Sequence, residues 1–202
     1  MITTEEETVF TFAELSEDAK EHARDWMRDC EMRDFDPCME PYETAARIIG
    51  IEDIDIAYSG FYSQGDGASF KGTFSFVPGC CTAIRKEFGR DSELHRIADE
   101  LSALNCRLRL AHGITLKGTI TRNDARYCHD YTMQAEIHDE NGDSPECLTV
   151  QDDDEFTDLM RRFARWIYKG LEEDYEYRLS DAAIDESIEA NEYHFTEEGE
   201  IV

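Results

Sequence analysis

The sequence predicts an α+β fold in which a largely antiparallel sheet packs against helices. Apolar residues recur at helical spacing in several blocks, while β-branched and aromatic residues concentrate in others. The two kinds of block are mixed rather than strictly alternating, which favours antiparallel strand pairing. Because 41% of the 202 residues are hydrophobic and 11% are aromatic, the chain can form a core despite its high charge. We expect a single domain, 1–202, with an acidic helical part from about 152 to 202.

The N-terminal part predicts one short strand and two helices. Residues 8–12 are rich in β-branched and aromatic side chains and read as a strand. Ser16 is a favoured N-cap residue, and the helix that it opens is expected to end near Cys30. A second helix, 42–49, is expected to end at Gly50, because glycine readily takes the left-handed conformation that closes helices.

The middle of the chain predicts most of the sheet. The strongest hairpin signal is the pair of β-rich segments within 54–76, which flank a turn from Gln64 to Gly67 with an Asp-Gly step. The next segment, 92–104, has leucine and isoleucine at helical spacing. Two further strands are expected over 107–121 and 127–138, separated by turn-like residues at 122–124 and followed by a loop at 139–143.

The last third predicts two helices. The longer one, 155–177, carries an apolar stripe that should face the core, consisting of Phe156, Leu159, Met160, Phe163, Ile167 and Leu171. Ser180 and Asp181 are expected to open a final helix that ends at Ala190. Residues 192–195 could then return as a short strand.

The charge is the feature with the clearest functional meaning. The sequence has 47 acidic and 20 basic residues, a formal net charge of −27. Nucleic acids and anionic membranes carry charge of the same sign, so we expect direct binding to neither and a basic protein as partner. Few cations follow Glu136, namely Arg161, Arg162, Arg165, Lys169 and Arg178. Carboxylates displayed along the C-terminal helices could therefore imitate the field of DNA.

The sequence gives ten candidate partner-binding carboxylates. They are Asp66, Asp152, Asp153, Asp154, Glu172, Glu173, Asp174, Asp185, Glu186 and Glu189. The expected mechanism is electrostatic steering by the acidic surface. Aromatic anchors would then supply affinity if they are exposed, and the candidates are Phe61, Tyr62, Trp166 and Tyr168.

Catalytic and metal-binding patterns are weak. Cys128, His129 and Asp130 are consecutive, and on a strand neighbouring side chains point to opposite faces, so they would not form a catalytic relay. The seven cysteines include no Cys-x-x-Cys pair, and we expect reduced thiols that mostly fill small core positions. The histidines are scattered, so we expect no metal and no cofactor. The basic cluster 161–169 is expected to pair within its own helix, Arg162 with Asp158 and Lys169 with Glu173.

Several segments resemble a known family. They are residues 59–70, which contain Ser-Gln-Gly-Asp-Gly, then Gly72, 94–98, 175–177 and 191–199. Together they resemble a family of acidic proteins from phages and bacterial genomes, whose members often carry the label antitoxin of a toxin–antitoxin stability system. The resemblance implies a phage or mobile-element origin and supplies no catalytic residues.

These observations predict a non-enzymatic protein that blocks a basic, nucleic-acid-binding host or defence protein. The start at Met1 lacks a basic signal-peptide region and no long apolar run follows, so we expect a cytoplasmic location in a bacterial host. Three alternatives stay open. The protein could be an antitoxin for a basic toxin, an enzyme acting on nucleotides or small molecules through Asp66, Cys128 or His129, or an ordinary acidic protein of a halophile.

Overall fold

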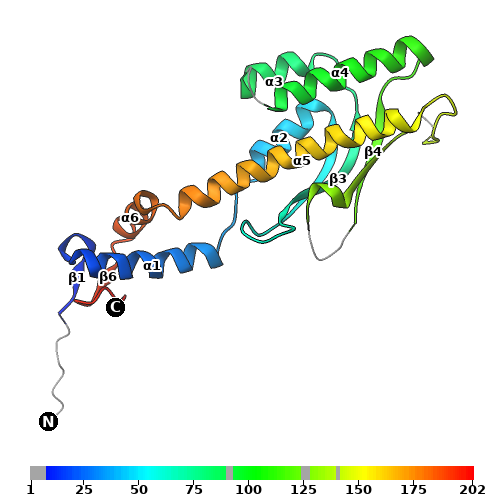
Figure 1. Ribbon diagram of the computed structural model, residues 1–202. Helices are drawn as coiled ribbons and strands as arrows, with labels where there is room; N and C mark the ends of the chain where they lie inside the picture. The colour runs from blue at the N-terminus through cyan, green and yellow to red at the C-terminus, as the bar shows by residue number, and fades with distance from the viewer. Residues whose placement is uncertain (1–7, 90–92, 124–127, 140–141) are drawn as a thin grey trace. The chain divides into compact units, whose positions relative to one another are not determined.

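The computed structural model describes residues 8–89, 93–123, 128–139 and 142–202, and these residues form the α+β fold that the sequence predicts (Figure 1). Some expected positions lie outside the described residues, namely Ser92 of the expected helix, Asp124 of the expected turn, Tyr127 of the expected strand, and Glu140 and Asn141 of the expected loop. The elements in chain order are β1 Phe10–Thr11, η1 Phe12–Glu14, α1 Glu17–Arg33, α2 Glu40–Ile49, β2 Ile51–Ser59, β3 Gly67–Ser75, α3 Cys80–Phe88, α4 Glu93–His112, β4 Lys117–Arg122, η2 Asp130–Thr132, β5 Met133–Ile137, α5 Val150–Arg178, α6 Asp181–Ala190 and β6 His194–Phe195.

The chain divides into two compact units. Unit 1 consists of residues 1–37 and 171–202, and unit 2 consists of residues 38–170. Helix α5 contributes its last turns to unit 1 and the rest of its length to unit 2. That the chain folds as one domain stays a prediction, and each unit is described by itself below.

Unit 2 is built on a four-stranded antiparallel sheet with the strand order β2-β3-β4-β5. The predicted hairpin is confirmed, because Ile56 of β2 pairs with Phe70 of β3. Ile120 of β4 pairs with Gly72 on one side and with Ala135 of β5 on the other. The sheet therefore forms largely from neighbouring strands in the sequence, as antiparallel sheets commonly do.

The core of unit 2 lies between this sheet and α5. The predicted apolar stripe of α5 is confirmed, and Phe156 and Phe163 are completely buried. Phe163 packs edge-on against Phe70, with ring centroids 5.5 Å apart, and Phe156 packs in the same way against Phe74 at 5.1 Å. Such aromatic pairs stabilise a core beyond the area that they bury.

Three predictions in unit 2 were wrong in part. The segment after 104 is helix rather than strand, because Leu104 and Leu108 continue the buried face of α4 to its end at His112. The next strand starts only at Lys117. Helix α3 was not predicted, and β5 begins at Met133 rather than at 127. In the segment after 104, a short apolar run was compatible with either helix or strand.

Unit 1 packs α1 and α6 around a small aromatic core. The predicted caps are confirmed: the hydroxyl of Ser16 accepts a hydrogen bond from the amide of Ala19, and that of Ser180 accepts one from Ala183. Helix α1 runs three residues beyond the expected end at Cys30. The buried cluster consists of Phe12, Leu15, Ala19, Ala23, Met27, Ile184, Ile188 and Phe195. Trp26 and Tyr193 close its edge with an edge-on contact at 5.3 Å.

Strands β1 and β6 form a two-stranded antiparallel sheet at the edge of unit 1. Phe10 pairs with Phe195, and Thr11 pairs with His194. The short strand expected over 192–195 is confirmed for its last two residues. Among the described residues, no helix combines the length and the apolar character that a bilayer crossing needs.

Candidate functional site

The negative charge is unevenly divided between the two units. Unit 1 has 24 of the 47 acidic residues and 5 of the 20 basic ones, a formal charge of −19 on 69 residues. Unit 2 has the other 23 acidic and 15 basic residues, a formal charge of −8 on 133 residues. Most of the net charge therefore belongs to the smaller unit.

The part of unit 1 after Arg178 contains eight acidic residues and no Lys or Arg. Two of the eight, Asp181 and Asp185, pair with arginines of α1. The other six are exposed and form no ion pair with any residue in the described ranges. We call these six the C-terminal acidic surface: Glu186, Glu189, Glu192, Glu197, Glu198 and Glu200.

The segment that carries this surface is held in place by the backbone. The amide of Thr196 donates to the carbonyl of Glu200 at 2.8 Å, and the amide of Gly199 donates to the carbonyl of Thr196 at 3.1 Å. Gly199 has a φ of +87°, and a β-carbon there would lie 2.1 Å from the carbonyl oxygen of Ala19 on α1. Only glycine therefore fits at this position, and the turn presents Glu197 and Glu198 outward from a defined backbone.

The two paired aspartates join α6 to α1. Arg24 donates to both carboxylate oxygens of Asp185, at 2.7 and 2.8 Å, and Arg28 pairs with Asp181. Hydrogen bonds from Arg28 and Arg24 also lower the pKa of Glu21. The arginines of α1 thus neutralise Asp181 and Asp185 and leave the six glutamates of the C-terminal acidic surface without a counter-ion among the described residues.

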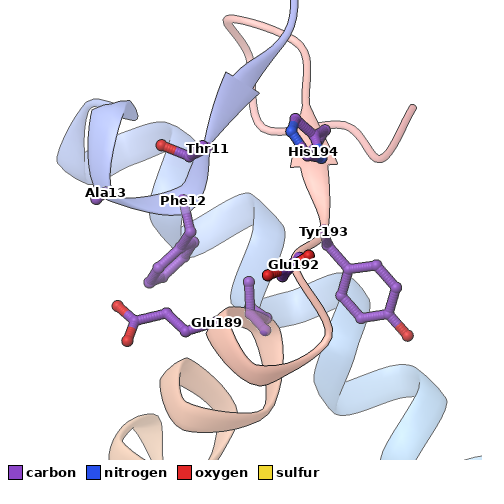
Figure 2. A pocket seen from close by; sticks show the side chains of 8 residues that line it. Thr11, Phe12, Ala13, Glu189, Glu192, Tyr193 and His194 are labelled. Atoms are coloured by element: carbon purple, nitrogen blue, oxygen red, sulfur yellow. The ribbon is translucent and has the colours of Figure 1, made fainter.

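A cavity of about 430 Å³ opens beside this surface, between β1 and η1 on one side and α6 and β6 on the other. Figure 2 shows the residues that line it, and in this view Phe12 lies between the carboxylates of Glu189 and Glu192. Ile188 adds an apolar side chain, and Ala13 lies at the edge formed by η1. Its volume falls within the usual range for ligand pockets.

The predicted candidate carboxylates in unit 2 mostly stabilise the unit itself. Asp66 Oδ2 accepts hydrogen bonds from the amides of Tyr62 and Ser63, at 3.0 and 2.7 Å, so it closes its own loop. Asp153 Oδ1 accepts from the amide of Ile137 on β5 at 2.9 Å. Of the four candidates in this unit, Asp154 is exposed and Asp152 is buried.

Asp152 caps the first turn of α5. It is 8% exposed, and its Oδ2 accepts from the amide and the hydroxyl of Thr149, while Oδ1 accepts from Arg107 at 2.9 Å. Burial raises the pKa of Asp152, but the hydrogen bonds from Thr149 and Arg107 outweigh it, and the pKa lies below its usual value. Asp152 therefore belongs to the structure of α5 rather than to an exposed surface.

The remaining candidates lie in unit 1. Asp174 pairs with Arg178 of the same helix at 3.2 Å, and Asp185 is held by Arg24. Glu172 is half-buried and Glu173 is exposed. Only Glu186 and Glu189 of the ten candidates belong to the C-terminal acidic surface. Its other four glutamates were not among the predicted candidates, although the lack of any Lys or Arg after Arg178 marks them.

The expected aromatic anchors differ in exposure. Tyr62 is 74% exposed, as an anchor requires. Phe61 is half-buried and stacks on Tyr168, with centroids 5.7 Å apart. Trp166 stacks on Phe163 at 5.6 Å and is also half-buried. Phe61, Tyr168 and Trp166 therefore take part in the packing of unit 2.

Two expectations about the basic cluster and the cysteines need correction. Arg162 pairs with Glu93 and Glu100 of α4 and not with Asp158, because its half-buried guanidinium reaches across to the neighbouring helix. Only Cys80 among the seven free cysteines is buried, while Cys38, Cys106 and Cys147 are exposed, so most do not fill core positions. Burial raises the pKa of the Cys81 thiol to about 11.

The consecutive residues Cys128, His129 and Asp130 form no relay in the described geometry. They precede β5 instead of lying on a strand, and His129 Nδ1 accepts a hydrogen bond from the amide of Tyr131. Asp130 pairs with Arg165 at 2.9 Å. A second cavity, of about 440 Å³, lies near Arg122 and Arg161 in unit 2. Neither cavity is lined by Cys128, His129 or Asp66.

The described residues include no candidate metal centre. Among residues 8–89, 93–123, 128–139 and 142–202, no three His, Cys, Asp or Glu side chains gather in a way that could hold a metal ion.

Comparison with known proteins gives a family. A family model described as a domain of unknown function, DUF8835, matches residues 35–181, which is more than half of the chain. The chain belongs to the DUF8835 family. No curated protein and no solved structure matches it. The DUF8835 match covers all of unit 2 and stops before Glu186, so the C-terminal acidic surface lies outside the matched region.

Proposed function

We propose that this DUF8835 protein is a non-enzymatic inhibitor that binds and blocks a basic, nucleic-acid-binding protein. The observation that carries the proposal is the C-terminal acidic surface, where six exposed glutamates lack ion pairs with the rest of the described chain. Like charges held close together destabilise the compact state that carries them. A fixed backbone that displays them fits a surface whose charge serves binding.

The electrostatic argument favours a cationic protein as the partner. A unit with a formal charge of −19 repels DNA, RNA and anionic lipid, and it attracts a basic surface before contact. DNA-binding channels are lined by Lys and Arg that neutralise phosphates. Carboxylates can neutralise the same groups, so binding to such a channel would exclude the nucleic acid.

The setting that we propose is counter-defence by a phage or mobile element in the bacterial cytoplasm. It is supported by the resemblance of residues 59–70 and 191–199 to acidic phage and bacterial proteins. The second of these segments includes three members of the C-terminal acidic surface, Glu192, Glu197 and Glu198.

The test is affinity capture with the protein as bait, in host lysate treated with nuclease, followed by elution with a salt gradient. A matched pair of baits makes the result specific. The unit 1 variant carries E186Q, E189Q, E197Q and E198Q. The unit 2 variant carries E40Q, E43Q, E52Q and E87Q, which remove the same charge from exposed positions.

We expect the wild-type and the unit 2 variant to retain a basic nucleic-acid-binding protein that both salt and added DNA release. The unit 1 variant should retain much less, since charge-dependent association weakens when charges are removed from the contact surface. Equal retention by the two variants, or release by salt but not by DNA, would contradict the proposal.

A further inference from the structure

The cavity of unit 1 combines an apolar lining with two carboxylates. Phe12 and Ile188 are core residues that reach its wall, while Glu189 and Glu192 are exposed glutamates beside them (Figure 2). Neither glutamate has an ion pair with a residue in the described part of the chain. A guest that satisfies both features has a hydrocarbon stem and a positively charged end, as Arg and Lys do.

The backbone at Glu192 is unusual for this residue type. Its φ is +53°, in the left-handed region that glycine and asparagine enter most readily. The amide of Glu192 donates to the carbonyl of Glu189 at 3.1 Å, and that of Tyr193 donates to Ile188 at 3.4 Å. A tight turn at the end of α6 thus brings both carboxylates to the cavity, at a conformational cost that a glycine would avoid.

The cations nearest to the cavity are already neutralised. The guanidinium carbon of Arg24 lies 5.6 Å from the centre of the Phe12 ring, and Lys20 Nζ lies 6.0 Å from it. Arg24 pairs with Asp185 and Lys20 pairs with Glu17. The cationic groups of Arg24 and Lys20 already lie near the ring of Phe12. The attraction for a guest cation therefore comes chiefly from Glu189 and Glu192.

Further ionisable groups around the cavity are Glu14, Tyr193 and His194. Glu14 Oε2 accepts hydrogen bonds from the amide and the hydroxyl of Thr11, which lower the pKa of Glu14. His194 lines the cavity from β6 and is exposed. Around the cavity, carboxylates therefore outnumber the positively charged groups that are not already paired with a carboxylate.

We propose that this cavity binds the side chain of an arginine presented by the basic partner, an inference that rests on the proposed function. The planar guanidinium can bridge two carboxylates, and it is less strongly hydrated than an ammonium group, so it enters a partly apolar cavity more readily. The methylene groups of the arginine would contact Ala13 and Tyr193, which line the cavity and are exposed and half-buried respectively. Lysine would offer only a point charge.

The test uses blocked pentapeptides in which a single arginine, lysine or citrulline lies between glycines. Citrulline has nearly the shape of arginine without its charge. Amide chemical shifts of the full-length protein, followed by NMR during titration, report the site of binding. We expect saturable shifts at residues 11–13 and 188–194 with the arginine peptide, weaker binding of lysine and no response to citrulline.

Variants of the full chain locate the binding site. E189Q/E192Q should weaken binding of the arginine peptide about fivefold or more, because the two substitutions remove the two carboxylates that would pair with the guanidinium. The control D29N/E176Q removes the same charge from exposed positions of the same unit, outside the cavity and outside the C-terminal acidic surface, and should weaken binding of the peptide less than about twofold. Ala13→Trp, at an exposed position on η1, should fill the cavity and abolish binding without changing the charge.

The outcomes separate this inference from the proposed function. Equal binding of arginine and citrulline peptides, lysine binding as tight as arginine binding, or unchanged binding by the Ala13→Trp variant would overturn the arginine site. Any of these could occur while the basic protein is still captured through the outer glutamates. Thermal unfolding of each variant confirms that the fold is intact.

Discussion

Units 1 and 2 contain similar numbers of acidic residues but use them differently. In unit 2 many carboxylates hold elements together: Asp152 caps α5, Asp153 bonds to β5, and Glu93 and Glu100 bind Arg162. In unit 1 the arginines of α1 neutralise Asp181 and Asp185, and all six glutamates after Arg178 are left without an ion pair among the described residues. Acidic composition alone therefore does not identify a binding surface. The informative quantity is the charge that the fold leaves unpaired.

Substitutions in the two cores should have the largest effects on the free energy of unfolding. Phe156→Ala and Phe195→Ala each remove a completely buried ring, and each should lower the free energy of unfolding by about 3–5 kcal/mol. Hydrogen exchange should locate the damage, since the two rings lie in different units. We expect Phe195→Ala to accelerate exchange mainly in α1 and α6. Equal acceleration throughout β2–β5 would show that the chain unfolds as the single domain that its sequence predicts.

Replacing one arginine in each unit should change how the stability of the protein depends on salt, and the change should differ between the units. Arg24→Met and Arg162→Met each break charged hydrogen bonds, and each should cost about 2 kcal/mol in chemical denaturation. In unit 1 the loss also increases repulsion among the surplus carboxylates. Raising the salt concentration from about 0.1 M to about 1 M should therefore recover more stability for Arg24→Met than for Arg162→Met. Equal recovery would contradict the difference between the units.

Asp152→Asn should test the structural use of a carboxylate in unit 2. We expect a loss of about 1 kcal/mol at neutral pH, as for other helix caps. Because the pKa of Asp152 is lowered in the folded state, the stabilisation is complete above the unfolded-state pKa near 4 and is lost as the pH falls through the folded-state value. The difference between wild type and variant should therefore shrink in acid. A difference that grows below about pH 4 would contradict this assignment.

The smallest expected effect is on the stability of the two fourfold glutamine variants. At low ionic strength the unit 1 variant should be more stable than wild type by a few tenths of a kcal/mol, because repulsion falls. The stability of the unit 2 variant should differ less from that of wild type. Thermal unfolding at about 1 M salt, where the Debye length is about 3 Å, should remove the difference.

Local patterns in the sequence predicted much of the fold. Caps such as Ser16 and Ser180, the closing Gly50 and the stripe of α5 depend on neighbours in the chain, and all were confirmed. The end of α4 was misplaced because Leu108 fits a strand as well as a helix until its packing is known.

The candidate site was less accessible to sequence reasoning. Whether a carboxylate is surplus depends on long-range partners, such as Arg24 for Asp185, which lie 161 residues apart. The cavity requires η1 and α6 to meet, and no local motif records that contact. The sequence indicated an acidic C-terminal part, but pairing in the fold decided which of its glutamates are left.

The most direct test of surplus charge in unit 1 is the salt dependence of binding to a hexa-arginine peptide. Dissociation constants would be measured by calorimetry at several salt concentrations for wild type and for both fourfold glutamine variants. For wild type and the unit 2 variant, we expect the logarithm of the affinity to fall steeply with the logarithm of the salt concentration. For the unit 1 variant, we expect a lower affinity and a shallower dependence on salt. Equal slopes and equal affinities for the two variants would contradict the account.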